Sequence, residues 1–158
     1  MSVLSVTGLS KKFGDIVALD GVDLDVEKGE FFALLGPSAS GKTTTLRSIL
    51  GLTPAKTGAI NFDGKAITGA QSHTIARAGI GWVPDDRRIF PTLTVARNLA
   101  IGRKKTRFRS WSVKEMFEIF TALEHLMSRE CENLSGGEMQ MVSISRALLG
   151  SPGLVLMD

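Results

Sequence analysis

The sequence predicts an α/β fold, with a mostly parallel sheet that has an antiparallel β part and carries a helical insertion. Three observations support this: a glycine-rich loop between an apolar run and a helix, strands and helices alternating at both ends of the chain, and a helical stretch between them. We expect an α/β core with its N-terminal β part over residues 1–91, a helical subdomain over 92–150, and one further core strand over 151–158.

The first part of the chain is rich in strand patterns. Val3–Leu9 alternates weakly, and Val22–Val26 alternates apolar and acidic residues, which is typical of a half-buried strand. Phe31–Leu35 is an apolar run short enough for a fully buried strand, and Gly58–Phe62 is a strand closed by the turn residues Asp63 and Gly64. The next expected elements are a helix over Thr43–Leu52, a helix over Ser72–Arg77, a strand over Gly79–Val83 and a helix over Thr94–Ile101.

The second half is mainly helical. Ser112–Met127 has the strongest amphipathic pattern and begins with a Ser112-x-x-Glu115 capping box. Ser135–Leu149 is a further helix, and Leu154–Met157 is a buried strand that precedes Asp158. The apolar face of the amphipathic helix consists of Val113, Met116, Phe117, Phe120, Leu123 and Met127.

Composition excludes several classes of protein. The chain has 158 residues, 43% of them hydrophobic, and a net charge of +3, which is ordinary for a globular domain and suits an anionic ligand. A single cysteine, Cys131, excludes an intramolecular disulfide and favours a reducing compartment. No apolar run approaches the length of a membrane span, and the N-terminus lacks a signal-peptide pattern. If the protein works at a membrane, we therefore expect a partner to carry it there.

The glycine-rich loop has the phosphate-binding pattern G-x-x-x-x-G-K-[ST] (Walker A), with a strand pattern before it and a helix after it. Its backbone N–H groups would form a nest for the α- and β-phosphates of a nucleotide. Lys42 would reach the β- and γ-phosphates, and the Thr43 hydroxyl would bind Mg²⁺. The alternative is an ordinary glycine turn with an incidental lysine. The loop residues are Gly36, Pro37, Ser38, Ala39, Ser40, Gly41, Lys42, Thr43 and Thr44.

Two further motifs predict a magnesium ligand and a second anion site. Asp158 ends an apolar strand and suits the second Mg²⁺ contact of a phosphate-loop NTPase, although four apolar residues and an aspartate are a weak pattern alone. The segment Leu134–Glu138 reads Leu-Ser-Gly-Gly-Glu: Ser135 and Glu138 form a capping box, and two glycines leave the helix amides accessible. This helix start is a second expected anion site.

A basic run over Arg103–Arg109 carries five positive charges in seven residues. We expect a solvated connection between two helices. The alternative is a contact with anionic lipid or nucleic acid.

These motifs, in this order, resemble the ATP-binding subunits of ABC transporters over nearly the whole chain. The resemblance implies ATP and Mg²⁺ as cofactors and a head-to-tail dimer with a second ATPase subunit. Each ATP would lie between one phosphate loop and the other subunit's Ser135, Gly136, Gly137 and Glu138. Phe13 matches the aromatic residue that stacks on adenine, and Asp85 matches the glutamine that touches Mg²⁺.

The segments Leu46–Leu52 and Gly81–Leu99 are more specifically similar to the ATPases of branched-chain amino acid importers. The resemblance implies that ATP binding and hydrolysis drive solute import at the cytoplasmic face of the inner membrane, where membrane permease subunits hold the protein peripherally. Direct solute contact and nucleic-acid binding are not expected. The alternatives are a non-hydrolysing nucleotide-binding fragment and a soluble ABC ATPase that acts on nucleic acid or ribosomes.

The sequence departs from the family in three main respects, and Met139 in place of the usual glutamine is a lesser departure. The family's catalytic glutamate would follow Asp158, where the given sequence ends, so we expect a core truncated at this strand that binds ATP far better than it hydrolyses it. Ala39 replaces a glycine, which strains the loop by about 1–2 kcal/mol if φ is positive there. Asp85 replaces the glutamine with a carboxylate, which adds charge beside the γ-phosphate.

Overall fold

The computed structural model describes residues 2–158, which form two compact units that divide after Ile75. Helix α2 (Ser72–Ala78) spans the division. Each unit is described by itself below.

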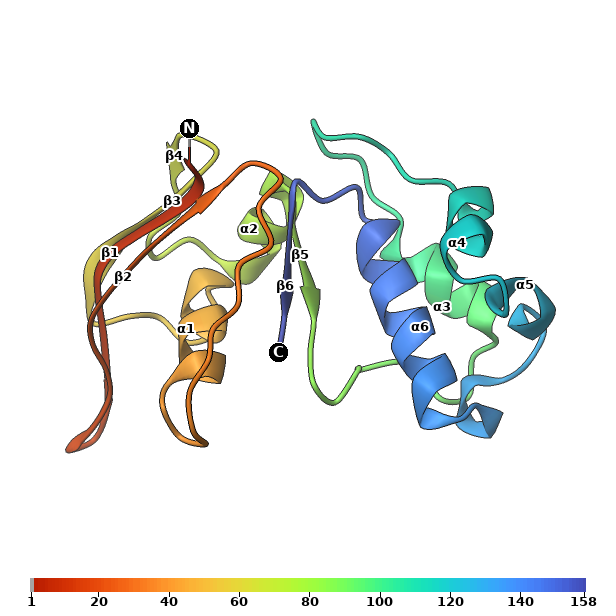
Figure 1. The fold of residues 1–158 in the computed structure, drawn as a ribbon, viewed down its shortest axis with the longest axis horizontal. Coiled ribbons are helices and arrows are strands. Elements are labelled where there is room, and N and C mark those ends of the chain that lie inside the picture. The colour runs from red at the N-terminus through yellow and green to blue at the C-terminus, as the bar shows by residue number, and fades with distance from the viewer. Residues whose placement is uncertain (1) are drawn as a thin grey trace. The chain divides into compact units, whose positions relative to one another are not determined.

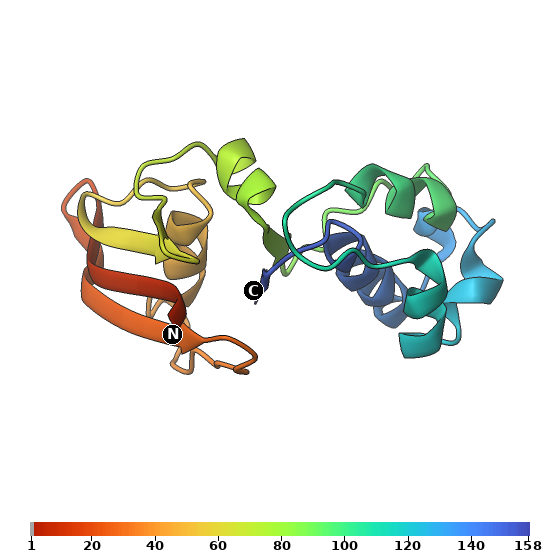
Figure 2. The same ribbon diagram turned by 90° about the horizontal axis from the view of Figure 1, so that it is seen from above.

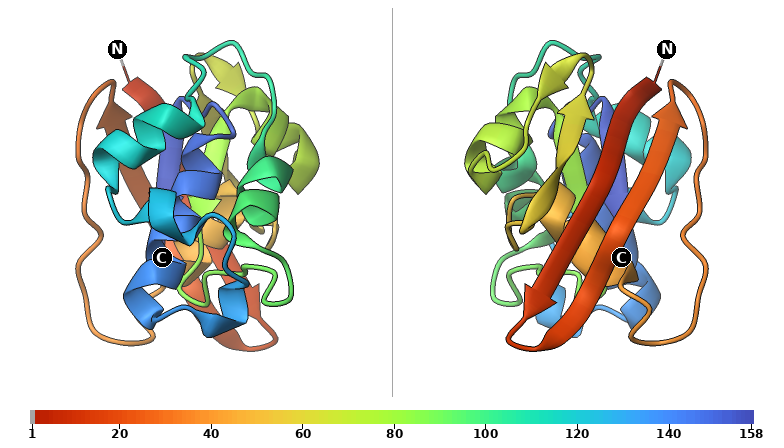
Figure 3. Two further views of the ribbon diagram at one scale, coloured as in Figure 1. Left: turned by 90° about the vertical axis from the view of Figure 1, so that its right-hand side faces the viewer. Right: turned by 90° about the vertical axis from the view of Figure 1, so that its left-hand side faces the viewer.

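The N-terminal unit is built on a four-stranded antiparallel sheet in the order β2-β1-β3-β4 (Figure 1). β1 (Ser2–Phe13) and β2 (Ile16–Glu27) form a long hairpin, β3 (Thr57–Phe62) pairs with the other edge of β1, and β4 (Lys65–Ala66) continues the sheet. Helix α1 (Lys42–Ile49) lies against one face of this sheet (Figure 3). The buried apolar side chains of these strands and of α1 include Leu4, Val6, Leu9, Leu19, Val26, Leu46, Ile49, Ile60 and Phe62.

The C-terminal unit combines one pair of parallel strands with a group of helices (Figure 2). β5 (Ile80–Val83) pairs with β6 (Leu154–Met157). The helices are α3 (Val95–Gly102), α4 (Val113–Ile119), α5 (Leu123–Leu126), the short 3₁₀ turn η1 (Cys131–Asn133) and α6 (Gly136–Leu148). Their common core contains Val95, Leu99, Met116, Leu123, Leu126, Cys131, Leu134, Val142 and Leu149.

The prediction of a buried strand over Phe31–Leu35 was wrong. The segment has no regular secondary structure, and the side chains of Phe31 and Leu35 are 95% and 91% exposed. A strand forms only when a neighbour completes its backbone hydrogen bonds, and no strand within residues 2–158 pairs with this segment. The prediction of a mostly parallel sheet is also corrected within residues 2–158: the four-stranded sheet is antiparallel, and parallel pairing is confined to β5 (Ile80–Val83) and β6 (Leu154–Met157).

The single helix expected over Ser112–Met127 is divided into α4 and α5. Phe120 leaves the helical region of the backbone at φ −125° and ψ 84°, and a turn follows it. The predicted apolar face is nevertheless buried, because Met116 and Leu123 lie in the core and the other members pack against it. The capping box of Ser112 and Glu115 is confirmed.

Candidate functional site

The phosphate loop leads directly into α1, and no side chain caps the first turn of this helix. Gly41 occupies the N-cap position at φ 88°. Ala39 also lies in the left-handed region, at φ 65°. The loop residues 36–40 are exposed. Successive backbone amides beside an uncapped helix N-terminus form a nest with partial positive charge.

Lys42 folds back over this loop. Its ammonium group donates to the carbonyl oxygens of Gly36 and Pro37, both at 2.7 Å, and to Ser40 Oγ at 3.3 Å. These contacts place the cation beside the loop, where it would meet a phosphate group. Thr43 lies in the first turn of α1, as the prediction of a magnesium ligand requires.

One glycine of the motif, Gly41, is sterically required, and a second, Gly36, lies close to the Ser40 side chain. A Cβ on Gly36 would lie 2.7 Å from Ser40 Oγ, and a Cβ on Gly41 would lie 2.7 Å from the Ala18 carbonyl oxygen and 2.8 Å from Leu19 Cδ2. The loop is therefore curled tightly on itself and its helix end lies close to β2. This geometry fits a phosphate chain bound by backbone N–H groups.

Phe13 lies at the end of β1, beside the hairpin turn. Its ring is 51% exposed, and the Lys11 ammonium lies 5.2 Å from the ring centroid. An exposed aromatic face is what stacking on adenine needs.

Asp85 and Asp158 both follow the carboxyl ends of the paired strands β5 and β6. Val83 and Met157 are register partners at the ends of these parallel strands, and the Asp158 amide donates to the Val83 carbonyl oxygen at 3.0 Å. Asp85 follows two residues after Val83, and its Oδ1 accepts from the Asp86 amide at 2.7 Å. Carboxylates at this edge suit a hard cation such as Mg²⁺. No cluster of three or more His, Cys, Asp or Glu side chains suited to a metal ion occurs within residues 2–158.

The Leu-Ser-Gly-Gly-Glu segment forms the predicted start of α6. Ser135 Oγ accepts from the Glu138 amide at 3.3 Å, and the Glu138 carboxylate accepts from the Ser135 amide at 2.7 Å. The hydrogen bond from the Ser135 amide to the carboxylate lowers the pKa of Glu138, and the Ser135 side chain and the Arg129 guanidinium at 3.9 Å lower it further. Gly136 and Gly137 are exposed, so their amides are accessible to an anion.

Sequence reasoning missed Arg87 and Gln140, whose side chains join the segment after β5 to α6. Arg87 Nε donates to Gln140 Oε1 at 3.1 Å across 53 residues of sequence. Two adjacent arginines were the only local signal, and nothing in their spacing indicated this contact.

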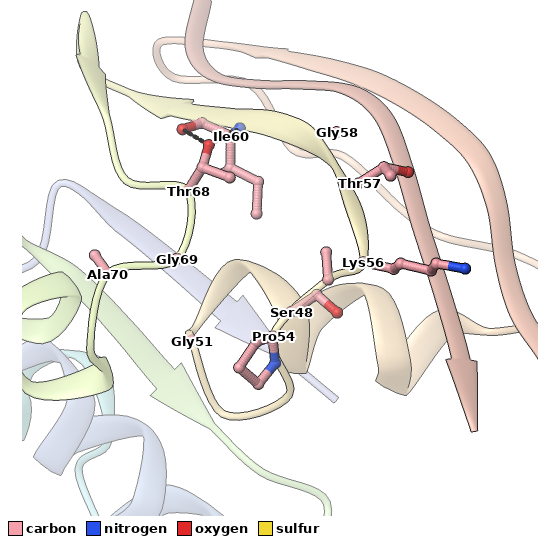
Figure 4. Close-up of a pocket in the computed structure, with 11 residues that line it drawn as sticks. Ser48, Gly51, Pro54, Lys56, Thr57, Gly58, Ile60, Thr68, Gly69 and Ala70 are labelled. Carbon is pink, nitrogen blue, oxygen red and sulfur yellow. Dashed lines mark hydrogen bonds between the residues drawn. The ribbon is translucent and has the colours of Figure 1, made fainter. Parts of the chain in front are cut away.

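A cavity of about 100 Å³ in the N-terminal unit is separate from these sites (Figure 4). It lies beyond the C-terminal end of α1, between Pro54, Gly58 and Ala70. None of the predicted site residues lines it.

Cys131 is fully buried, and its Sγ accepts a hydrogen bond from Asn98 Nδ2 at 3.2 Å. Burial also raises the pKa of the thiol, so Cys131 has a structural role. Within the described part of the chain, no helix has both the length and the apolar character needed to cross a bilayer.

The sequence matches the family model described as ABC transporter over residues 19–158. It is 38% identical over 158 residues to the high-affinity branched-chain amino acid transport ATP-binding protein BraG of Pseudomonas aeruginosa, covering 99% of this chain and 68% of BraG. It is 37% identical over 160 residues to the spermidine/putrescine import ATP-binding protein PotA of Bacteroides fragilis, covering 99% of this chain and 34% of PotA. The chain thus spans about two thirds of one relative and one third of the other.

Solved structures have the same fold. The ADP conformation of MJ1267, an ATP-binding cassette of an ABC transporter, superposes with a TM-score of 0.82 at 32% identity, covering 98% of this chain and 67% of that one. A dimeric post-hydrolysis state of the ATP-binding cassette MJ0796, bound to ADP and Pi, superposes with a TM-score of 0.80 at 28% identity, covering 98% and 73%.

Proposed function

Because the chain belongs to the ATP-binding cassettes of ABC transporters, we propose that it binds Mg·ATP at the phosphate loop and drives solute import with membrane permease partners. One observation carries the binding step: the ammonium of Lys42 lies on the carbonyls of a curled loop that leads into an uncapped helix N-terminus.

The remaining site residues have separate roles in this proposal. Phe13 stacks on adenine, and the amides of Ser38–Thr43 hold the α- and β-phosphates. Thr43, Asp85 and Asp158 are the protein ligands of Mg²⁺, which would neutralise phosphate charge. Ser135, Gly136, Gly137 and Glu138 act on the nucleotide held by a second copy of the chain. The division into a core over 1–91 and 151–158 and a helical subdomain over 92–150 belongs to the same proposal.

Branched-chain amino acids are the proposed solutes. The name of BraG and the segment Gly81–Leu99 support this assignment, whereas PotA is named for polyamine import. Copurification with the permease subunits of a branched-chain amino acid importer, but not with those of a polyamine importer, tests it.

Titration calorimetry with Mg·ATP tests the binding step. We expect saturable binding by the chain and at least a tenfold loss of affinity in Lys42→Ala, because a charge-assisted contact to phosphate disappears. Lys65→Ala, which removes an exposed lysine on β4, is the matched control and should bind like the unmodified chain. Equal affinities in the two variants would refute the proposal.

A further inference from the structure

Arg87 lies along the first turns of α6, whose start carries the Leu-Ser-Gly-Gly-Glu segment Leu134–Glu138, called the signature below. Its Nε donates to Gln140 Oε1 at 3.1 Å. A Cβ built on Gly136 would have Arg87 Nη2 as its nearest neighbour, at 3.7 Å. Gly136 and Gln140 are four residues apart and so share one face of α6. The guanidinium therefore extends from the second turn of α6 towards its amino-terminal end.

The backbone holds this arginine in an unusual conformation. Arg87 and Arg88 both lie in the left-handed region, at φ 59° and φ 43°, which non-glycine residues rarely adopt. The Arg87 carbonyl oxygen accepts from Ser143 Oγ and from Arg146 Nη2, both at 3.0 Å. Both donors come from α6. These bonds fix the Arg87 backbone on the helix, and so they fix the direction in which its side chain leaves the chain.

The positive charge of Arg87 is not neutralised by a carboxylate. Its Nε bond is to a neutral amide, and no ion pair of Arg87 occurs within residues 2–158. The nearby carboxylate of Glu138 is already engaged by the Ser135 amide and lies 3.9 Å from Arg129. The helix start thus presents exposed glycine amides and a guanidinium whose terminal nitrogens are available to an anion.

We propose that Arg87 is a phosphate-binding residue of the signature. It contacts the terminal phosphate of a nucleoside triphosphate that a second copy of the chain holds in its phosphate loop. This inference rests on the proposed function. It adds a cationic side chain, supplied from the segment after β5, to a site whose other hydrogen-bond donors are a hydroxyl and backbone amides.

The test is a titration of the ¹⁵N-labelled chain with Mg·ATP, followed at individual backbone amides. The amides of Ser40–Thr43 report the phosphate loop, and those of Gly136 and Gly137 report the signature. The variant is Arg87→Gly, which removes the guanidinium, suits the left-handed backbone and retains the carbonyl that Ser143 and Arg146 bind. Arg88→Gly is the matched control, because it removes a neighbouring arginine with the same backbone conformation.

In Arg87→Gly we expect the midpoint at Gly136 and Gly137 to move to a roughly three- to tenfold higher Mg·ATP concentration, while the phosphate-loop midpoint stays unchanged. Arg88→Gly should leave both midpoints unchanged, and Arg87→Lys should recover part of the loss. The inference is overturned if the two glycine variants behave alike, or if the signature amides do not respond while the phosphate loop does. A phosphate loop that does not respond refutes the proposed function itself.

Discussion

Replacing Ala39 by glycine should stabilise the N-terminal unit, although glycine usually destabilises folded proteins. Ala39 has φ 65°, where a Cβ costs about 1–2 kcal/mol. Glycine removes this strain, but its greater freedom in the unfolded chain costs about 0.4–1 kcal/mol. The difference predicts a gain of about 0.5–1 kcal/mol in the free energy of unfolding, which for a unit of this size is a rise in Tm of about 2–8 °C.

Urea unfolding of Ala39→Gly measures this gain. Ala59→Gly is the matched control, because Ala59 is exposed within β3 and pairs with Thr7. Glycine in a strand should cost about 0.5–1 kcal/mol, so the two variants should shift the unfolding midpoint in opposite directions. If Ala39→Gly loses as much stability as Ala59→Gly, the strain assigned to Ala39 is absent.

Three further predictions concern the C-terminal unit. Asn98→Ala should lower the free energy of unfolding, measured in urea, by about 2–4 kcal/mol. The buried Asn98 side-chain amide forms hydrogen bonds with the backbone of Phe90 at 2.8 and 2.9 Å, and these backbone groups would be left unpaired. A loss under about 1 kcal/mol would contradict this. Gly153→Ala should lower the free energy of unfolding, because its Cβ would lie 2.5 Å from the Phe108 ring. This loss of stability should be smaller when Phe108 is also replaced by alanine. A double-mutant cycle that shows no coupling between the two positions would contradict the clash. The pKa of Glu138 is lowered, so its capping contribution is fully present above the ordinary glutamate pKa and is lost as the pH falls through the lowered pKa. The NMR chemical shift of the Ser135 amide should therefore titrate at a pH below the ordinary glutamate pKa. This titration should be absent in Glu138→Gln.

Local patterns predicted the local backbone geometry of this chain well. The capping boxes at Ser112 and Ser135 formed as expected, since each involves residues three apart whose geometry the helix itself supplies. The positive φ that was suspected at Ala39 is present, because the curl of the loop depends on its own few residues. Most other helices and strands were also predicted, with their ends shifted by up to several residues. The exceptions are the strand expected over Phe31–Leu35, directly before the phosphate loop, and the break between α4 and α5.

Features that depend on distant partners were not predictable in the same way. Phe31–Leu35 has the composition of a buried strand, but its strand state depends on a neighbouring strand that an apolar run does not specify.

The sequence by itself determined which groups are available to a nucleotide: a loop of backbone amides, a lysine, a hydroxyl, two carboxylates and a second helix start with bare glycines. Only the tertiary structure decided that Asp85 and Asp158 share one sheet edge and that Arg87 lies on α6. The physical reason is the sequence separation of the residues in contact. Caps and turns are settled by residues within one turn of each other, whereas these contacts join segments more than fifty residues apart, which only the packed fold brings together.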